Sequence, residues 1–451
     1  MSRRWTARLA LAAGLAALLV LVVFGGLGSL VLMGVGWAGL GLTAAGVWWM
    51  LTHTGWIRAL ALLLVVAAPV AVLVLYAAAG LLWVVLVSLG LWLLAVGAGR
   101  AALADGTSPA MPERPVGRAR RPFLIMNPRS GGGKVGKFRL AERARALGAE
   151  VVVLDPAHRQ DVAELARRAV RDGADLLGVA GGDGTQALVA GVAAEHDIPF
   201  MVISAGTRNH FAMDLGLDRQ DPSTCLEALT DGVELRVDIG HIHAGHVPTG
   251  EPADRNAGRV FVNNASFGVY AAVVQSPAYR DDKARTMLEM LPDLLTHHSG
   301  ARLSVSAGPL TVDGPQAVLV SNNPYQRGDS AGLGRRERLD SGELGVLSVD
   351  VTSAAEAAQL LLYGGQGRGL TEVTAREVVV DADAPVIPVG VDGEALMLPT
   401  PVHCRLAPGA LRVRVPRHRP GVPYSPPPVD WRRVRRLALT MGRVAAGRGA
   451  D

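Results

Sequence analysis

Two glycine-rich segments carry the residue types that bind phosphate groups. The first reads Asn-Pro-Arg-Ser-Gly-Gly-Gly-Lys at residues 127–134, directly after a short apolar run at 123–126. Consecutive glycines let the backbone form a concave nest of amides that can approach phosphate oxygens closely. A helix expected at 134–148 would point its positive N-terminus at the same place. Lys134, one of three lysines in a chain with 42 arginines, adds a compact ammonium group.

The second segment is Gly-Gly-Asp-Gly-Thr at residues 181–185, after an apolar run at 175–180. Asp183 could hold a metal ion or accept a proton, and Thr185 is expected to cap the next helix. The simpler alternative is an ordinary tight turn in which Asp183 or Thr185 serves only as an N-cap. A third polar turn at 204–211 follows the apolar run at 198–203. Polar turns at the carboxyl ends of parallel strands are where α/β sheets bind ligands.

The first loop also contains a weak match to the dinucleotide-binding fingerprint. Gly131, Gly133 and Gly136 have its spacing, and Asp155 lies where the ribose-binding acid would be. The fingerprint requires its first glycine at the strand end, but residues 127–130 intervene here. The sequence does not fit the phosphate loop ending in Gly-Lys-Ser/Thr either, because Val135 follows the lysine.

The elements that must position these loops alternate between strands and helices. Strands are expected at 123–126, 150–154, 175–180 and 198–203, and helices at 134–148, 161–172 and 186–196. This alternation predicts a parallel α/β domain at residues 122–238. After it, strand-like runs dominate at 234–243, 260–264, 301–305, 317–320, 344–351 and 377–380, with helices at 283–298 and 354–363. They predict a mainly antiparallel β-sandwich domain at residues 239–415.

The N-terminal hundred residues have a different composition. Between residues 9 and 99 the only charged residue is Arg58, and four apolar stretches occur at 7–24, 29–51, 59–79 and 81–98. Each is about long enough to span a bilayer, so residues 1–99 are predicted to be a helical membrane block of four spans. A cleaved signal peptide is disfavoured, because apolar sequence resumes directly after the first stretch.

Charge distribution predicts how this block is oriented. With the N-terminus inside, the five arginines nearest the span ends all face the cytoplasm, and the soluble part follows there. They are Arg3, Arg4, Arg8, Arg58 and Arg100. This predicts a multi-pass protein of the cell membrane whose N-terminus and soluble domains are cytoplasmic.

The remaining charge is segregated along the chain. Residues 1–99 carry a net charge of +4, the linker at 100–121 carries +3, residues 122–415 carry −8 and the tail at 416–451 carries +6. Positive charge beside the membrane segments fits an anionic lipid surface better than nucleic acid. The tail is Pro-rich up to residue 428, and residues 431–446 fit either an interfacial amphipathic helix or a disordered basic segment. The two cysteines, Cys225 and Cys404, exclude a disulfide framework.

Taken together, the three turns resemble the diacylglycerol kinase catalytic-domain family, which includes bacterial lipid kinases and sphingosine kinases. The resemblance covers about residues 122–415. Val-Asp-Ile-Gly at 237–240, Phe-Val-Asn-Asn-Ala-Ser-Phe-Gly at 261–268 and Val-Asp-Gly-Glu at 391–394 also resemble family elements. The joint presence of Gly-Gly-Asp-Gly-Thr and Val-Asp-Gly-Glu is the most specific part of this resemblance.

The resemblance implies that ATP binds between the two domains with Mg²⁺ on its phosphates, and that a lipid hydroxyl attacks the γ-phosphoryl group. The nucleotide-binding residues that it implies are Asn127, Ser130, Gly131, Gly132, Lys134, Gly181, Gly182, Asp183, Gly184, Thr185, Gly206, Thr207 and Asn209. It further implies that Asp183 and Asp238 contact the metal. Asp392 is expected to accept the proton with Glu394 as its partner, and Asp183 is the alternative base. Taken alone, Asp392-Gly393 also fits an ordinary hairpin turn.

The leading hypothesis is therefore a membrane-anchored, ATP-dependent lipid kinase acting on a diacylglycerol-like membrane lipid. Two alternatives stay open: a soluble-substrate enzyme of the NAD kinase type, and a nucleotide- or lipid-binding membrane sensor with weak catalysis. The sensor is motivated by His210 and Ser341, which stand where the family usually has acids. No nucleic acid partner is expected, and homodimer formation is left open.

Overall fold

The computed structural model describes residues 3–25, 28–53, 55–103, 111–158, 160–207, 209–245, 258–268, 271, 301–325, 335–336, 338–350, 369–421 and 431–439. Contacts between residues divide the chain into two units. The helical unit contains α1 to α4 and the C-terminal helix α13, and the sheet unit contains the strands and the remaining helices. Each unit is described by itself.

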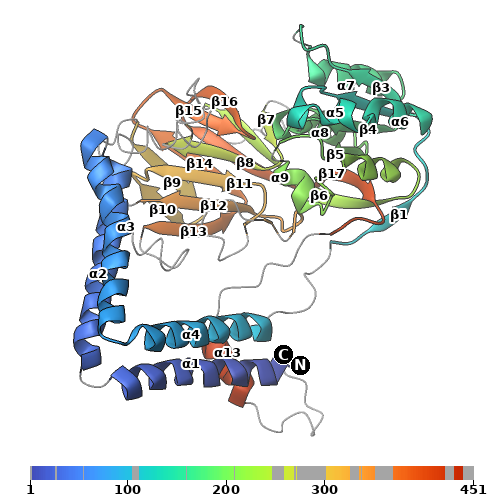
Figure 1. The fold of residues 1–451 in the computed structure, drawn as a ribbon. Coiled ribbons are helices and arrows are strands. Elements are labelled where there is room, and N and C mark those ends of the chain that lie inside the picture. The colour runs from blue at the N-terminus through green and yellow to red at the C-terminus, as the bar shows by residue number, and fades with distance from the viewer. Residues whose placement is uncertain are drawn as a thin grey trace. The chain divides into compact units, whose positions relative to one another are not determined.

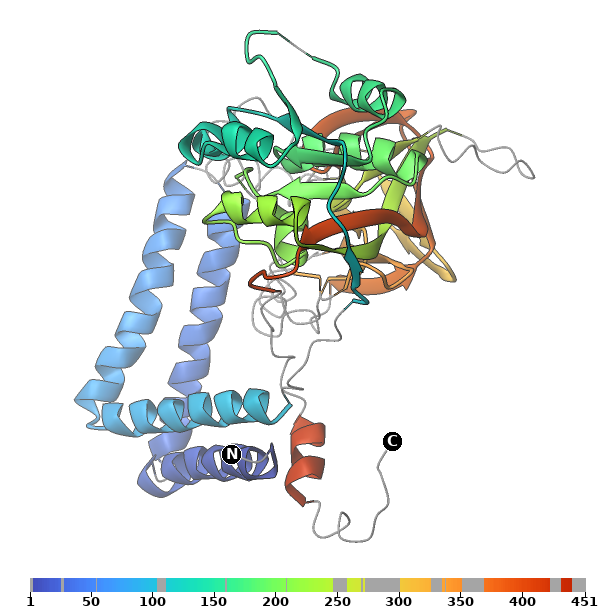
Figure 2. The same cartoon turned by 90° about the vertical axis from the view of Figure 1, so that its right-hand side faces the viewer.

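The helical unit contains four helices that are long and apolar enough to cross a membrane. They are α1 (Arg3–Gly25), α2 (Gly28–Thr52), α3 (Gly55–Ala78) and α4 (Leu82–Leu103). The four apolar stretches of the sequence are thus confirmed as helices. α1 packs along α4, where Ser88 Oγ donates a hydrogen bond to the Ala17 carbonyl oxygen at 3.1 Å, and α2 packs along α3 (Figure 1). α13 (Trp431–Leu439) packs against α1 and α4 (Figure 2).

The α/β part of the sheet unit is built on four parallel strands in the order β5-β4-β2-β3. Its strands are β2 (Pro122–Met126), β3 (Glu150–Val153), β4 (Leu176–Ala180) and β5 (Phe200–Ile203). Its helices are η1 (Ser130–Gly132), α5 (Lys134–Lys137), α6 (Leu140–Ala146), α7 (Val162–Arg171), α8 (Asp183–Glu195), α9 (His210–Asp214) and η2 (Pro222–Leu229). The predicted parallel, helix-covered sheet is confirmed.

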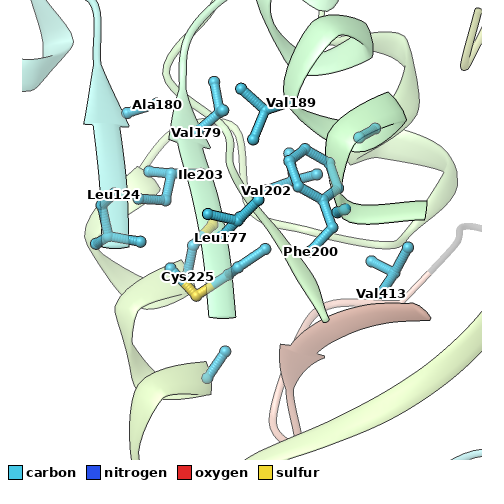
Figure 3. Close-up of a cluster of buried hydrophobic side chains, with 14 of the residues drawn as sticks. Leu124, Leu177, Val179, Ala180, Val189, Phe200, Val202, Ile203, Cys225 and Val413 are labelled. Carbon is cyan, nitrogen blue, oxygen red and sulfur yellow. The ribbon is translucent and has the colours of Figure 1, made fainter. Parts of the chain in front are cut away.

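Three of the four strands in this part are completely apolar. Every residue of β2, β4 and β5 is buried, as expected for parallel strands that are covered on both faces. Figure 3 shows side chains from these strands packing together with Val189 of α8 and Cys225 of η2. Cys404 is buried in the second core cluster, so both cysteines are free core residues, in agreement with the excluded disulfide framework.

One helix differs from its prediction. The helix expected at 134–148 is divided into α5 and α6, because Arg139 adopts a left-handed conformation with φ 49°. α5 is a single turn of four residues, so only a short helix follows the first glycine-rich loop. Its expected helix-dipole contribution to an anion site is correspondingly small.

The second part of the sheet unit is a sandwich of two sheets. One is the six-stranded sheet β13-β12-β11-β8-β15-β16, and the other is the continuation β10-β9-β14-β17 of the α/β sheet (Figure 1). Its strands are β7 (Arg259–Phe261), β8 (Asn264–Gly268), β9 (Leu303–Ala307), β10 (Leu310–Asp313), β11 (Ala317–Ser321), β12 (Leu344–Val349), β13 (Leu370–Ala375), β14 (Glu377–Ala382), β15 (Val386–Val391) and β16 (Glu394–Pro399). All pairings within the six-stranded sheet are antiparallel, which confirms the predicted β-rich domain.

Two long strands join the α/β part to the sandwich. β6 (Gly232–Ala244) and β17 (Val402–Pro416) pair antiparallel along almost their whole length, with a bulge between Ala407 and Leu411. Val413 of β17 pairs in parallel with Phe200 of β5. The predicted boundary at residue 238 therefore lies inside β6, and the chain returns to the α/β core near residue 411.

The segment expected as a linker at 100–121 is partly structured. α4 continues to Leu103, and β1 (Arg114–Val116) pairs antiparallel with β6. The helices predicted at 283–298 and 354–363 lie outside the described residues.

Candidate active site

Three loops meet at the carboxyl edge of the parallel strands. The amide of Asn127, just after β2, donates to the Ala180 carbonyl oxygen at the end of β4, at 2.8 Å. A side chain on Gly131 would collide with the carbonyl oxygen of Ala205, which follows β5. A Cβ on Gly206 would lie 2.8 Å from the Gly181 carbonyl oxygen. The structure thus brings together the three turns that the sequence singled out, in contacts that leave no room for side chains.

The backbone conformation of the first loop depends on glycine. Gly131, Gly132 and Gly133 have φ values of 55°, 71° and 82°, a left-handed run that glycine adopts at little cost. Lys134 Nζ donates to the Arg219 carbonyl oxygen at 2.7 Å. Burial lowers the pKa of Lys134, and the Arg219 charge lowers it further. The loop therefore presents backbone amides, while the lysine is held by the segment after α9.

A buried side-chain pair locks the second and third loops together. Gln186 Nε2 donates to the Gly181 carbonyl oxygen at 3.0 Å and to Asn209 Oδ1 at 3.1 Å. Asn209 Nδ2 in turn donates to the Gly206 carbonyl oxygen at 3.2 Å. Asn209 is only 1% exposed. Its side chain therefore positions the loops. Gln186 was not predicted as a site residue, and its only signal is an amide side chain directly before the apolar run at 187–194.

Asp183 is the first residue of α8. The N-cap is Gly182, which has no side-chain capping bond, so neither Asp183 nor Thr185 caps the helix. The predicted capping role of Thr185 is wrong, because the helix begins at Asp183 and Thr185 lies inside its first turn. Among the described residues, Asp183 Oδ1 is buried without a hydrogen-bond partner. Burial raises the pKa of Asp183, and the neighbouring His210 acts in the opposite direction.

Asp392 lies in the β15–β16 hairpin. It has the backbone conformation of a hairpin-turn residue and also the environment of a buried carboxylate. Asp392 and Gly393 have φ values of 47° and 84°, as in the hairpin turns that require two left-handed residues. The Asp392 carboxylate also accepts three backbone amides, from Val262 at 2.8 Å, Asn263 at 2.8 Å and Asn264 at 3.0 Å. Burial raises the pKa of Asp392 to about 7, and the charge of Asp183 contributes to this rise against the three N–H donors.

Glu394 joins this hairpin to the Gly-Gly-Asp-Gly-Thr loop. A Cβ on Gly184 would collide with Glu394 Oε1, and the other carboxylate oxygen forms an ion pair with Arg259 Nη2. The most specific pair of motifs in the sequence, one from each domain, is therefore in direct contact.

Asp238 has a different environment. Its Oδ1 accepts the Gly409 amide and its Oδ2 accepts the Gly342 amide, both at 2.8 Å. Burial raises the pKa of Asp238. These bonds tie β6 to the β17 bulge and to the segment before β12. The metal role of Asp238 stays a prediction, since its observed contacts serve the backbone. Within the described part of the chain, no group of three or more His, Cys, Asp or Glu side chains is arranged to hold a metal ion.

Arg336 is a buried residue that donates hydrogen bonds to several segments, and no sequence pattern indicated it. It is fully buried, and its Nε donates to Asp214 Oδ2 of α9 at 2.7 Å. Its Nη1 donates to the carbonyl oxygens of Val262 and Asn322 at 2.7 Å, and its Nη2 donates to Asn263 Oδ1 at 2.8 Å. One guanidinium thus connects α9 to the backbone turn that Asp392 also holds.

Replacing Arg336 by glutamine should strongly destabilise the fold. The change leaves the Asp214 carboxylate buried without its charge partner, which costs about 3–5 kcal/mol. In detergent solution we expect the melting temperature to fall by roughly 10 °C. The matched control is Arg338→Gln, because Arg338 pairs with Asp340 at a partly exposed site, where ion pairs contribute about 0–1 kcal/mol. Equal melting temperatures for the two variants would contradict the role of Arg336.

Comparisons with known proteins agree on one family. The sequence model described as "Diacylglycerol kinase catalytic domain" matches residues 121–242. A diacylglycerol kinase of Mycobacterium tuberculosis is 27% identical over 310 residues, covering 65% of this chain and 94% of the relative. A protein of Xanthomonas oryzae pv. oryzae named "Probable lipid kinase YegS-like" is 30% identical over 286 residues, covering 58% of this chain and 85% of the relative.

Solved structures match this chain at low sequence identity. A diacylglycerol kinase from Bacillus anthracis strain Sterne is 16% identical with a TM-score of 0.46, covering 66% of this chain and 97% of that chain. A second structure from this organism reaches a TM-score of 0.50 at 18% identity, covering 66% and 98%. The fold and the three converging loops agree with these similarities. The chain belongs to the diacylglycerol kinase catalytic-domain family.

Proposed function

We propose that this protein is a membrane-anchored lipid kinase that transfers the γ-phosphoryl group of ATP to the hydroxyl of a diacylglycerol-like lipid. The observation that carries the proposal is the meeting of two carboxylates from different domains. Asp183 lies at the edge of the phosphate-type loops, and its charge raises the pKa of Asp392 in the sandwich. Phosphoryl transfer needs mainly alignment and charge stabilisation, which fixed loops and carboxylates supply.

The residues present fit ATP with a magnesium ion on its phosphates. The amides of Gly131 and Gly132 in the glycine-rich loop and the amides at the start of α8 could donate to phosphate oxygens. Mg²⁺ is usually held by one or two carboxylates together with substrate phosphates, rather than by an all-protein cage. The partnerless Oδ1 of Asp183 supplies such a ligand. When bound, the ion would neutralise charge on the transferred group.

Asp392 would take the proton of the lipid hydroxyl. A carboxylate with a pKa of about 7 is half ionised near neutral pH, where a general base is most effective. Its three amide contacts hold it in one orientation, and Arg259 holds Glu394 beside the same turn.

We further propose that the four apolar helices anchor the enzyme in the cell membrane, with the N-terminus and the kinase domains cytoplasmic. Support comes from their length and composition and from the arginines near the span ends. Anchoring would keep the enzyme at a high effective concentration relative to a substrate in the same bilayer.

A phosphoryl-transfer assay tests the proposed function. The full-length protein in detergent–lipid mixed micelles would receive labelled ATP, Mg²⁺ and, in parallel, diacylglycerol, a sphingoid base or NAD. We expect label in the diacylglycerol product and none in NAD. Label only in NAD would identify an NAD kinase-type enzyme. ATP binding without transfer to any acceptor would favour a membrane sensor, the second candidate, which the position of His210 beside Asp183 supports.

A further inference from the structure

The C-terminal helix α13 is an integral part of the helical unit. Val434 and Ala438 are 0% and 7% exposed, and they pack in one apolar cluster with small residues of α1 and α4. Those residues are Ala7, Ala10, Ala98 and Ala102. Arg8 Nε donates to the Ala438 carbonyl oxygen at 3.3 Å, and the Trp431 ring lies 5.7 Å from the ring of Trp92. Of the two interpretations of the tail, the amphipathic helix is confirmed for residues 431–439.

The arginines of α13 are not equivalent. At 100° per residue, Arg435, Arg432 and Arg436 lie about 40°, 100° and 140° around the helix from Trp431, and Arg433 follows at about 200°. The three arginines line an open cavity of about 530 Å³ together with Trp431 and with Leu11 of α1. The cavity thus combines three guanidinium groups with an apolar wall, and Arg433 is outside it.

The charge of this cavity indicates its ligand. Residues 3–103 and 431–439, the described part of the helical unit, contain no Asp or Glu. Arginine binds phosphate groups through paired N–H donors, and three arginines favour a phosphate of high charge. A phosphodiester carries one negative charge, whereas a phosphomonoester carries about 1.5 to 2 at neutral pH. The cavity lies where α1 begins and α4 ends, so the available anion with an apolar attachment is a phospholipid.

We propose that this cavity binds the headgroup of a phosphomonoester phospholipid. Arg432, Arg435 and Arg436 hold the phosphate, and the root of the acyl chains lies against Leu11 and Trp431. A lipid of this class is also what the proposed kinase would produce. The site therefore gives the protein a second place to bind its product. The proposal rests on the membrane placement proposed above and does not require catalysis.

A lipid-binding experiment on the full-length protein in detergent micelles tests this site. Native mass spectrometry without ATP would follow titration with dioctanoyl phosphatidic acid, dioctanoyl phosphatidylglycerol, glycerol 3-phosphate and inorganic phosphate. We expect phosphatidic acid to bind most tightly. Arg435→Gln should weaken its binding about tenfold, the equivalent of 1.4 kcal/mol. Arg433→Gln makes the same charge change on the same helix and should alter binding less than about twofold.

Three results would overturn the proposal. Equal losses of phosphatidic acid affinity in Arg433→Gln and Arg435→Gln would mean that the helix attracts the lipid through its overall charge and not through the cavity. Equal affinity for phosphatidylglycerol would exclude monoester selectivity, and equal affinity for glycerol 3-phosphate would exclude a lipid site. Any product bound at the catalytic loops contributes equally to both variants, so their difference reports only the α13 cavity. A protein without kinase activity could still show this difference, which keeps the two proposals separable.

Discussion

Asp183→Asn is expected to lower kcat for phosphoryl transfer at least about 100-fold, the size of effect seen when a group that stabilises transition-state charge is removed. The substitution preserves shape but removes the negative charge from a buried oxygen that has no hydrogen-bond partner among the described residues. Such an oxygen is costly to bury, which fits its proposed role as a ligand of Mg²⁺. We also expect the Mg²⁺ concentration needed for half-maximal rate to rise. Both quantities follow from initial rates of lipid phosphorylation at saturating ATP.

Asp172→Asn is the matched control, because Asp172 is exposed at the end of α7 in the same domain. It should leave the rate and the Mg²⁺ dependence unchanged. Equal melting temperatures for the two variants and the wild type would show that the loss is chemical. Full activity in Asp183→Asn would remove the Gly-Gly-Asp-Gly-Thr loop from the proposed mechanism.

The convergence of the three loops could be predicted from the sequence, because their residues follow apolar runs that alternate with helices. In a parallel sheet those positions share one edge. The contact of Glu394 with Gly184 was not predicted, since about 200 residues separate them and no local pattern encodes the pairing; the family resemblance only assigned both motifs to the active site. The same holds for Arg336, whose position gives no sign that it is fully buried.

Local irregularities of the backbone account for the remaining differences between the predicted and the observed elements. β17 was not predicted because Pro408 and Gly409 interrupt its alternation, yet the bulge there lets the Gly409 amide reach Asp238. The break at Arg139 is a single left-handed residue within a helical pattern, so hydrophobic periodicity does not register it. The membrane-type helices were predictable because composition alone defines them.

The second large effect concerns Asp392 and pH. In the wild type, kcat/KM is expected to rise with pH around a midpoint near 7, because only the ionised carboxylate can accept the hydroxyl proton. The pKa of Asp392 is raised in the folded state. Its contribution to folding stability is therefore fully present below the ordinary aspartate pKa and is lost as pH rises through about 7. The catalytically active ionisation state is thus the less stable one, as expected for a carboxyl group selected for chemistry.

Asp392→Asn separates a base from a positioning residue. Asparagine offers one acceptor oxygen where the carboxylate accepts three amides, so at least one N–H of residues 262–264 would face its amide group. The unmet donor costs about 1–3 kcal/mol of stability. Loss of the proton acceptor should lower kcat by about 10² to 10⁴. If Asp392 is the base, the residual rate of the variant should no longer fall as the pH is lowered through about 7. Because ATP ionises identically in both assays, nucleotide titration cannot produce that difference. If the rate of Asp392→Asn still falls below about pH 7, Asp183 is identified as the base, and Asp392 orients the turn at residues 262–264.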